Sequence, residues 1–302
     1  MPQASPDMEF ALALLAGQRR AVAAVEEAMP AIAQAALVLA DVLRAGGRLI
    51  YAGAGSPALI AVQDGAELPG TFGIDAARIH FVVAGGLDNL VRLDGAAEDD
   101  AVAAARDMAR LAPLARDIVI AVSASGTTSF TLSAADAARQ GGAKVIAIAN
   151  RPGAPLLAPA DVAVLLDTGA EALHGSTRMA AGTAQKAALG LISTLAAAHL
   201  GHVHAGHMVN VRPENAKLRL RALHIIGEIT AVDADVANAS LTLAEGDVKS
   251  AILIAAGAAT RQTALGLLAR SQGHAGEALA LLRAGEATVQ SGARAPIEGR
   301  RA

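Results

Sequence analysis

Two glutamates in this sequence could work as an acid–base pair. Glu67 and Glu98 stand 31 positions apart, and each follows a segment that is typical of a buried strand. Pro69 and Gly70 are expected to end the first helix and leave Glu67 exposed at its end, whereas Glu98 is expected in the first turn of the next helix. A carboxylate in a first turn also suits the helix dipole, so Glu98 has an ordinary structural explanation too. The two become a catalytic pair only if the fold brings them together.

Two loops of small and hydroxyl residues could bind an anion. The first contains Gly55 and Ser56, but Ala58 stands where a dinucleotide-binding loop has its third glycine, and a plain strand-to-helix turn remains the alternative. The second loop contains Ser123, Ser125, Gly126, Thr127 and Thr128. A helix cap needs one hydroxyl, so the surplus favours a phosphate held by hydroxyls and backbone amides.

A third polar segment, residues 171–186, precedes an expected long helix and supplies further candidate ligands. These are Glu171, Ser176, Thr177 and Lys186. Four histidines follow, at positions 199, 202, 204 and 207, and their spacing fits neither one helix face nor a strand. A solvated helix end and loop explains them better than a metal site, so we predict no metal and no cofactor.

The composition limits the classes of partner. The chain has 302 residues, 53% of them hydrophobic and 18% charged, with a formal net charge of −3. With that net charge the chain lacks the basic field that would favour nucleic acid or anionic lipid. Trp is absent and there is one Tyr, so it also lacks aromatic residues on which bases could stack. Cysteine is absent, which excludes disulfides and agrees with a reducing compartment. We expect a cytoplasmic protein with a small-molecule partner.

Two apolar stretches resemble membrane segments, but the charged residues in or beside them argue against that interpretation. Residues 10–16 follow Asp7 and Glu9 and precede Arg19 and Arg20, a polarity that does not suit a signal peptide. Arg261 interrupts the most apolar C-terminal stretch, so no run reaches the roughly 18 residues of a span. We therefore expect no membrane partner.

Five short β-branched runs must position these candidates. They lie at residues 48–52, 79–84, 118–122, 144–149 and 162–166, and Ala-rich helical segments at 56–67, 98–111 and 129–139 separate them. This alternation predicts an α/β fold with a doubly wound, parallel five-stranded sheet in three layers. Ligands of such sheets bind beyond the carboxyl ends of the strands. Further helical regions are predicted at 183–200, 217–229 and 247–268, with a frayed tail from 285.

Taken together, these strings resemble the N-acetylmuramic acid 6-phosphate etherase family of the sugar-isomerase (SIS) superfamily. The residues that carry the resemblance are Gly53-Ala54-Gly55-Ser56, Asp64-Gly65-Ala66-Glu67, Ala97-Glu98-Asp99-Asp100, Ser125-Gly126, Gly175-Ser176-Thr177-Arg178-Met179, Gly182-Thr183-Ala184-Gln185-Lys186 and Met208-Val209-Asn210-Val211. The resemblance runs from about residue 30 to the C-terminal helices. It implies an N-terminal helical region at 1–47, an SIS domain at 48–212 and a small helical domain at 213–302.

The resemblance also implies an activity. A homodimer with its site near the subunit interface would remove the 3-O-lactyl group of a sugar 6-phosphate, leaving N-acetylglucosamine 6-phosphate and D-lactate. Glu67 matches the acid that protonates the departing oxygen, and Glu98 matches the base at C2. Leu59, Thr127 and Ala180 replace cations that are usual in the family. This difference keeps a non-catalytic sugar-phosphate sensor open as an alternative, and an aldose–ketose isomerase would use the same enolate chemistry.

Overall fold

A parallel sheet of five strands organises the first part of the chain in the computed structural model, which describes residues 5–292 and the side chains of residues 5–285. The strands are β1 (Leu49–Gly53), β2 (Ile79–Val83), β3 (Ile118–Val122), β4 (Lys144–Ala149) and β5 (Val162–Leu165), in the order β2-β1-β3-β4-β5. The predicted five-stranded sheet is confirmed, and β3 and β4 have the predicted bounds. Because the strands are parallel and in register, the loops that follow them meet at one edge.

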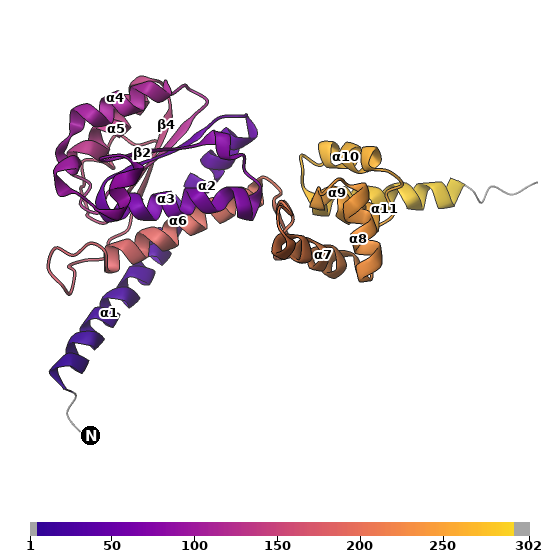
Figure 1. Cartoon of the computed structure of the whole chain (residues 1–302), viewed down its shortest axis with the longest axis horizontal. Helices are drawn as coiled ribbons and strands as arrows, with labels where there is room; N and C mark the ends of the chain where they lie inside the picture. The colour runs from indigo at the N-terminus through magenta and orange to yellow at the C-terminus, as the bar shows by residue number, and fades with distance from the viewer. Residues whose placement is uncertain (1–4, 293–302) are drawn as a thin grey trace, which may run out of the picture. The chain divides into compact units, whose positions relative to one another are not determined.

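Helices lie on both sides of the sheet (Figure 1), and alternate residues of each strand face opposite layers. One face packs Ile50, Val119 and Val145 against α4 (Ala101–Leu111) and α5 (Ser129–Gln140). The other face is covered by α2 (Met29–Arg44), α3 (Gly55–Phe72) and α6 (Ala180–His199). The predicted three-layer, doubly wound architecture is therefore confirmed.

The helices that carry the two glutamates differ from the prediction. Pro69 does not end α3, which continues to Phe72. A proline removes one hydrogen bond, but the helix closes three residues later, where Gly73 takes a positive φ of 64°. Glu98 is not in the first turn of α4, because Asp100 caps that helix by accepting a hydrogen bond from Ala103 N. Glu98 instead lies in a short 3₁₀ helix, Gly95–Asp99.

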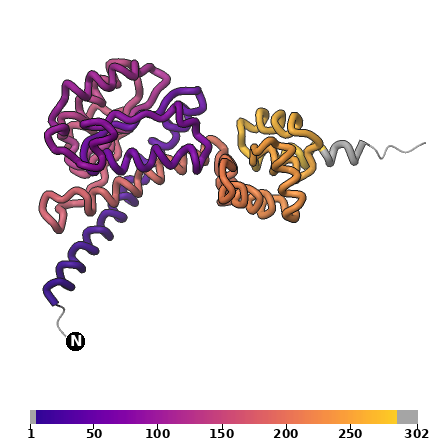
Figure 2. Tube along the Cα trace, viewed as in Figure 1, coloured from indigo at the N-terminus to yellow at the C-terminus, as the bar shows by residue number. Residues whose placement is uncertain are grey.

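Helix α1 (Pro6–Glu27) begins with a Ser5 cap and packs against α6. Its N-terminal half extends away from the rest of its unit in Figure 2. Met8, Phe10 and Leu12 there are each more than half exposed, at 53%, 51% and 54%. Within residues 5–292 no single helix is long and apolar enough to cross a membrane, and only the bent pair of α1 and α2 passes on length and composition.

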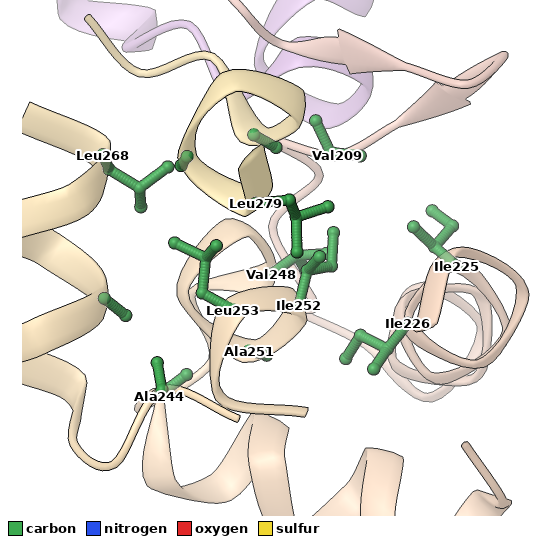
Figure 3. Packing of buried hydrophobic residues seen from close by; sticks show 14 of the residues in the cluster. Val209, Ile225, Ile226, Ala244, Val248, Ala251, Ile252, Leu253, Leu268 and Leu279 are labelled. Carbon is green, nitrogen blue, oxygen red and sulfur yellow. The ribbon is translucent and has the colours of Figure 1, made fainter. Parts of the chain in front are cut away.

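The chain divides into two compact units, and the second is helical. The first contains Leu68 and the residues before it with Ile74–His199; the second contains Pro69–Gly73 and the chain from Leu200 onward. The helices of the second unit are α7 (Ala216–Thr230), α8 (Ala234–Leu243), α9 (Val248–Ala255), α10 (Arg261–Arg270) and α11 (Ala275–Gly292). Val209, Ile226, Ile252 and Leu279 pack together at its centre (Figure 3).

Two predictions for this unit were wrong. The helical region predicted at 247–268 is two helices, α9 and α10, because Thr260 caps a new helix after Gly257 turns with a φ of 115°. The tail expected to fray from residue 285 continues α11 to Gly292, while residues 293–302 lie outside the described residues. The small C-terminal helical domain itself is confirmed.

Lys249 gives the second unit a predicted pH dependence. Its side chain is buried on α9 and donates one hydrogen bond, 2.9 Å long, to the Gly273 carbonyl. Burial lowers the pKa of Lys249 to about 8. The folded chain therefore holds fewer protons than the unfolded chain between pH 8 and the ordinary lysine pKa of about 10.4, so the free energy of unfolding should rise with pH in that window.

Lys249→Met should remove that rise in the free energy of unfolding, which is about 3 kcal/mol across the window. Urea unfolding followed by circular dichroism at several pH values measures it. Lys217→Met, at an exposed lysine in the first turn of α7, is the control and should keep the wild-type slope. An unchanged slope in Lys249→Met would refute the assignment.

Candidate functional site

Glu98 lies directly over the first candidate loop, which contains Gly55 and Ser56. A Cβ placed on Gly55 would be 2.5 Å from Glu98 Oε1, so the carboxylate occupies the space that a side chain at position 55 would need. Gly55 also has a positive φ of 59°, which a glycine adopts readily. Half-buried Ser56 is next to it in the first turn of α3. The fold therefore joins the predicted base and the predicted first loop at one place.

The hydroxyls of the second loop bond mainly to one another. Buried Ser123 Oγ lies 3.0 Å from Thr128 Oγ1 and accepts a hydrogen bond from Gly126 N at 3.0 Å. Ser125 Oγ accepts from Thr127 N at 3.2 Å and from Thr127 Oγ1 at 2.9 Å. Thr128 is the N-cap residue of α5, but its side chain makes no capping bond. Helix capping therefore does not explain these hydroxyls, and the Ser125 O–H remains able to donate to a ligand.

A pocket of about 260 Å³ opens beside this second loop, at the carboxyl ends of β3, β4 and β5. It is lined by Ala124, Ser125, Asn150, Arg151, Pro152, Asp167, Thr168, Gly169, Glu171, Thr177 and Ala181. Three of the predicted ligands line this pocket: Ser125, Glu171 and Thr177. Ser176, also predicted, is half-buried in the neighbouring turn before α6.

Glu171 caps helix α6 from the pocket wall. Its Oε2 accepts a hydrogen bond from Ala180 N at 3.0 Å, and its Oε1 accepts one from Ala181 N at 2.9 Å. A carboxylate at a helix N-terminus is stabilised by the free amides and by the helix dipole. Glu171 thus fixes the start of α6 against the pocket, and its carboxylate already has partners before any substrate binds.

Glu67 is exposed on α3. Helices α3 and α6 run side by side in Figure 1. Its Oε1 accepts a hydrogen bond from Gln63 Nε2 at 3.1 Å, and its Oε2 is 3.8 Å from Lys186 Nζ on α6. The fold therefore brings together two of the predicted site residues, Glu67 and Lys186. At this distance the ammonium and the carboxylate attract each other across α3 and α6.

A buried network beneath Glu67 holds α3 and α6 to the sheet. Tyr51 Oη donates to Asp64 Oδ2 at 2.6 Å, and Ser193 Oγ donates to Asp64 Oδ1 at 2.9 Å. Burial raises the pKa of the Asp64 carboxyl, although the bonds from Tyr51 and Ser193 oppose that effect. Asp64 is about one helical turn before Glu67 on α3. The network therefore fixes the position of this part of α3, and of the Glu67 backbone, relative to the sheet. The single tyrosine in a buried strand was the available signal, since its hydroxyl needs a partner.

A second buried pair was not predicted either. Gln185 Nε2 donates to Asn150 Oδ1 at 2.8 Å, and Asn150 Nδ2 donates to the Leu166 carbonyl at 3.1 Å. Asn150 lines the pocket, whereas Gln185 is fully buried on α6. The pair connects the ends of β4 and β5 to α6 and so supports the pocket floor.

The two glutamates do not meet within one chain. The Glu98 carboxylate lies beside Gly55, at the N-terminal end of α3. Glu67 is twelve residues after Gly55 on the same helix. At a rise of 1.5 Å per residue, the Cα atoms of Gly55 and Glu67 are about 18 Å apart along the axis of α3. Glu67 and Glu98 are also absent from the lining of the pocket. Within the described part of one protomer, the two carboxylates therefore do not share a site.

The histidines do not assemble a metal site in the part of the chain that the structure describes, where no group of three or more His, Cys, Asp or Glu side chains is suitably placed. His204 and His207 pair across the short hairpin of β6 (Val203–His204) and β7 (His207–Met208).

The sheet, its two helix layers and the pocket at its carboxyl edge define an α/β protein, and the family pattern described as SIS domain matches residues 16–150. The N-acetylmuramic acid 6-phosphate etherase of Deinococcus radiodurans is 42% identical over 91% of this chain and 90% of its own. That of Streptomyces avermitilis is 38% identical over 91% and 88%. The chain therefore belongs to the N-acetylmuramic acid 6-phosphate etherase family.

Among solved structures, a phosphoheptose isomerase from Francisella tularensis is similar, with 20% identity and a TM-score of 0.48 over 64% of this chain and 97% of that one.

Proposed function

We propose that this protein cleaves the 3-O-lactyl ether of N-acetylmuramic acid 6-phosphate, or of a closely related amino-sugar phosphate. The observation that carries the proposal is the 42% identity to a named etherase over 91% of the chain, with glutamates at both expected positions. The ring-opened substrate has an aldehyde at C1, so removal of the C2 proton gives an enolate. Expulsion of the C3 oxygen as D-lactate leaves an unsaturated aldehyde, and water adding at C3 gives N-acetylglucosamine 6-phosphate.

Each glutamate has a role in this sequence. Glu98 would take the C2 proton, beside a loop whose backbone amides can bind an anion. Glu67 would give a proton to the departing lactate oxygen and later assist the addition of water. Its neighbour Lys186, 3.8 Å away, can also contact an anionic substrate. The reaction consumes no oxidant or reductant, since the elements of water added at C3 replace the lactate lost there.

We propose further that the protein is a homodimer and that each site takes one glutamate from each protomer. The separation of Glu67 from Glu98 along α3 supports this arrangement, because one chain alone does not join them. The exposed apolar side chains of α1, among them Phe10 and Leu12, support an interface between copies. A cytoplasmic location agrees with a phosphorylated substrate and with the absence of cysteine.

Incubation of the purified protein with N-acetylmuramic acid 6-phosphate tests the proposed activity. Release of D-lactate, measured by an enzyme-coupled assay, together with N-acetylglucosamine 6-phosphate seen by mass spectrometry, would support it. Binding of the sugar phosphate without turnover would favour the sensor instead. Conversion of glucosamine 6-phosphate into its ketose isomer, with no lactate from the muramic acid substrate, would favour the isomerase.

A further inference from the structure

Arg151 is the one cationic residue among those that line the pocket beside the second loop. The same lining contains two carboxylates, on Asp167 and Glu171. Asp167 Oδ1 accepts a hydrogen bond from Gly169 N at 3.2 Å, and Glu171 caps α6. Without Arg151 the charged side chains of the pocket would all be negative. A phosphate dianion would then enter against two like charges.

The guanidinium of Arg151 has no acceptor within the described chain. Its backbone carbonyl accepts a bond from Ala154 N, but no hydrogen bond or ion pair of its side chain occurs there. Arg44 and Arg48 of the same unit are instead bonded to carboxylates or carbonyls. Arg151 therefore keeps its five N–H donors available to a ligand.

The turn that carries Arg151 is packed against the hydroxyl loop. Leu156 N donates to the Gly126 carbonyl at 3.1 Å, and a Cβ on Gly126 would be 2.4 Å from Ala154 Cβ. Pro152 follows Arg151 and restricts its backbone to extended conformations. Loop and turn therefore form one surface, and Ser125 of the loop and Arg151 of the turn both line the pocket.

We propose that Arg151 binds the phosphate group of the substrate in this pocket and sets the preference for phosphorylated sugars. The inference rests on the proposed function for the identity of the substrate, but not for the binding of phosphate itself. A guanidinium can donate two parallel hydrogen bonds to a phosphate, and Ser125 can donate a third from its hydroxyl. Asn150, held in place by Gln185, forms part of the same wall.

The test compares Arg151→Ala, Arg151→Gln and Arg151→Lys with Arg116→Ala as the matched control. Arg116 is an exposed arginine just before β3, at the opposite edge of the sheet from the pocket. We expect KM for N-acetylmuramic acid 6-phosphate to rise about 10- to 100-fold in the Ala and Gln variants, with a smaller change in kcat. Arg151→Lys should recover part of the loss, and Arg116→Ala should match the wild type. A wild-type KM in both Arg151→Ala and Arg151→Gln would overturn the proposal.

Direct binding separates this inference from the proposed activity. Calorimetry with inorganic phosphate as the probe should show weaker binding in Arg151→Ala than in the wild type, while D-lactate as the probe should show no difference between the two. If the protein releases no lactate but phosphate binding still depends on Arg151, the inference stands and the proposed function fails. If phosphate binds both proteins equally, or if only D-lactate binding is lost, Arg151 does not bind the phosphate.

Discussion

Glu67→Gln is expected to lower kcat for D-lactate release by about 10²- to 10⁴-fold, with little change in KM. The substitution keeps the size of the side chain and its ability to pair with Gln63, but it cannot deliver a proton to the departing oxygen. Steady-state kinetics on N-acetylmuramic acid 6-phosphate measures the change.

Glu277→Gln is the control for Glu67→Gln. Glu277 is an exposed glutamate on α11 of the other unit, so the same chemical change there should leave kcat as in the wild type. A Glu67→Gln protein that keeps kcat within about threefold would remove Glu67 from the mechanism, because general acid catalysis contributes far more than that.

The largest expected effect on stability is at Asp117, which connects β3 to the chain before β1. Its carboxylate is fully buried and accepts hydrogen bonds from Arg48 Nη2 at 2.6 Å, from Arg48 N at 3.0 Å and from Leu114 N at 2.9 Å. Asp117→Ala leaves these donors without an acceptor in a buried place. We expect a loss of about 3–5 kcal/mol in the free energy of unfolding, measured by urea denaturation.

The pKa of Asp117 gives the same interaction a pH signature. Burial alone would raise that pKa, but the hydrogen bonds from Arg48 and Leu114 outweigh burial and hold it below its ordinary value. Its contribution to stability is therefore present above the pKa of an unfolded aspartate and is lost as the pH falls toward the pKa of the folded state.

Asp136→Ala is the control for Asp117→Ala. It breaks the exposed pair with Arg139 and should cost less than about 1 kcal/mol in the free energy of unfolding. Equal losses in the two variants would contradict this account.

The sheet could be predicted because its strands are short, β-branched and separated by helical segments. Val119 and Val145 alternate with Ile118 and Ile146 between the two faces, as the period of a strand requires. Helix ends were harder to predict. Pro69 lies inside α3, where the later Gly73 ends the helix. The break between α9 and α10 was missed although Gly257 and Thr260 mark it, because the residues around them are Ala-rich.

The candidate site could be predicted in its loops but not in its contacts. Hydroxyls clustered around Gly126 indicate an anion-binding loop in the sequence itself, and the structure shows that they do not cap α5. The bond between Ser193 and Asp64 joins residues 129 positions apart, so only the folded chain shows it. The same holds for Glu98, whose place over Gly55 depends on how the segment after β2 returns to α3.

Co-expression of Glu67→Gln with Glu98→Gln tests the shared site most directly. Each variant alone should be inactive as a homodimer. If each site takes one glutamate from each protomer, a mixed dimer keeps one site with both glutamates intact, and random pairing should restore about one quarter of wild-type lactate release. If both glutamates act within one protomer, every site in the mixed dimer lacks one of them and no activity returns. That result would contradict the shared site.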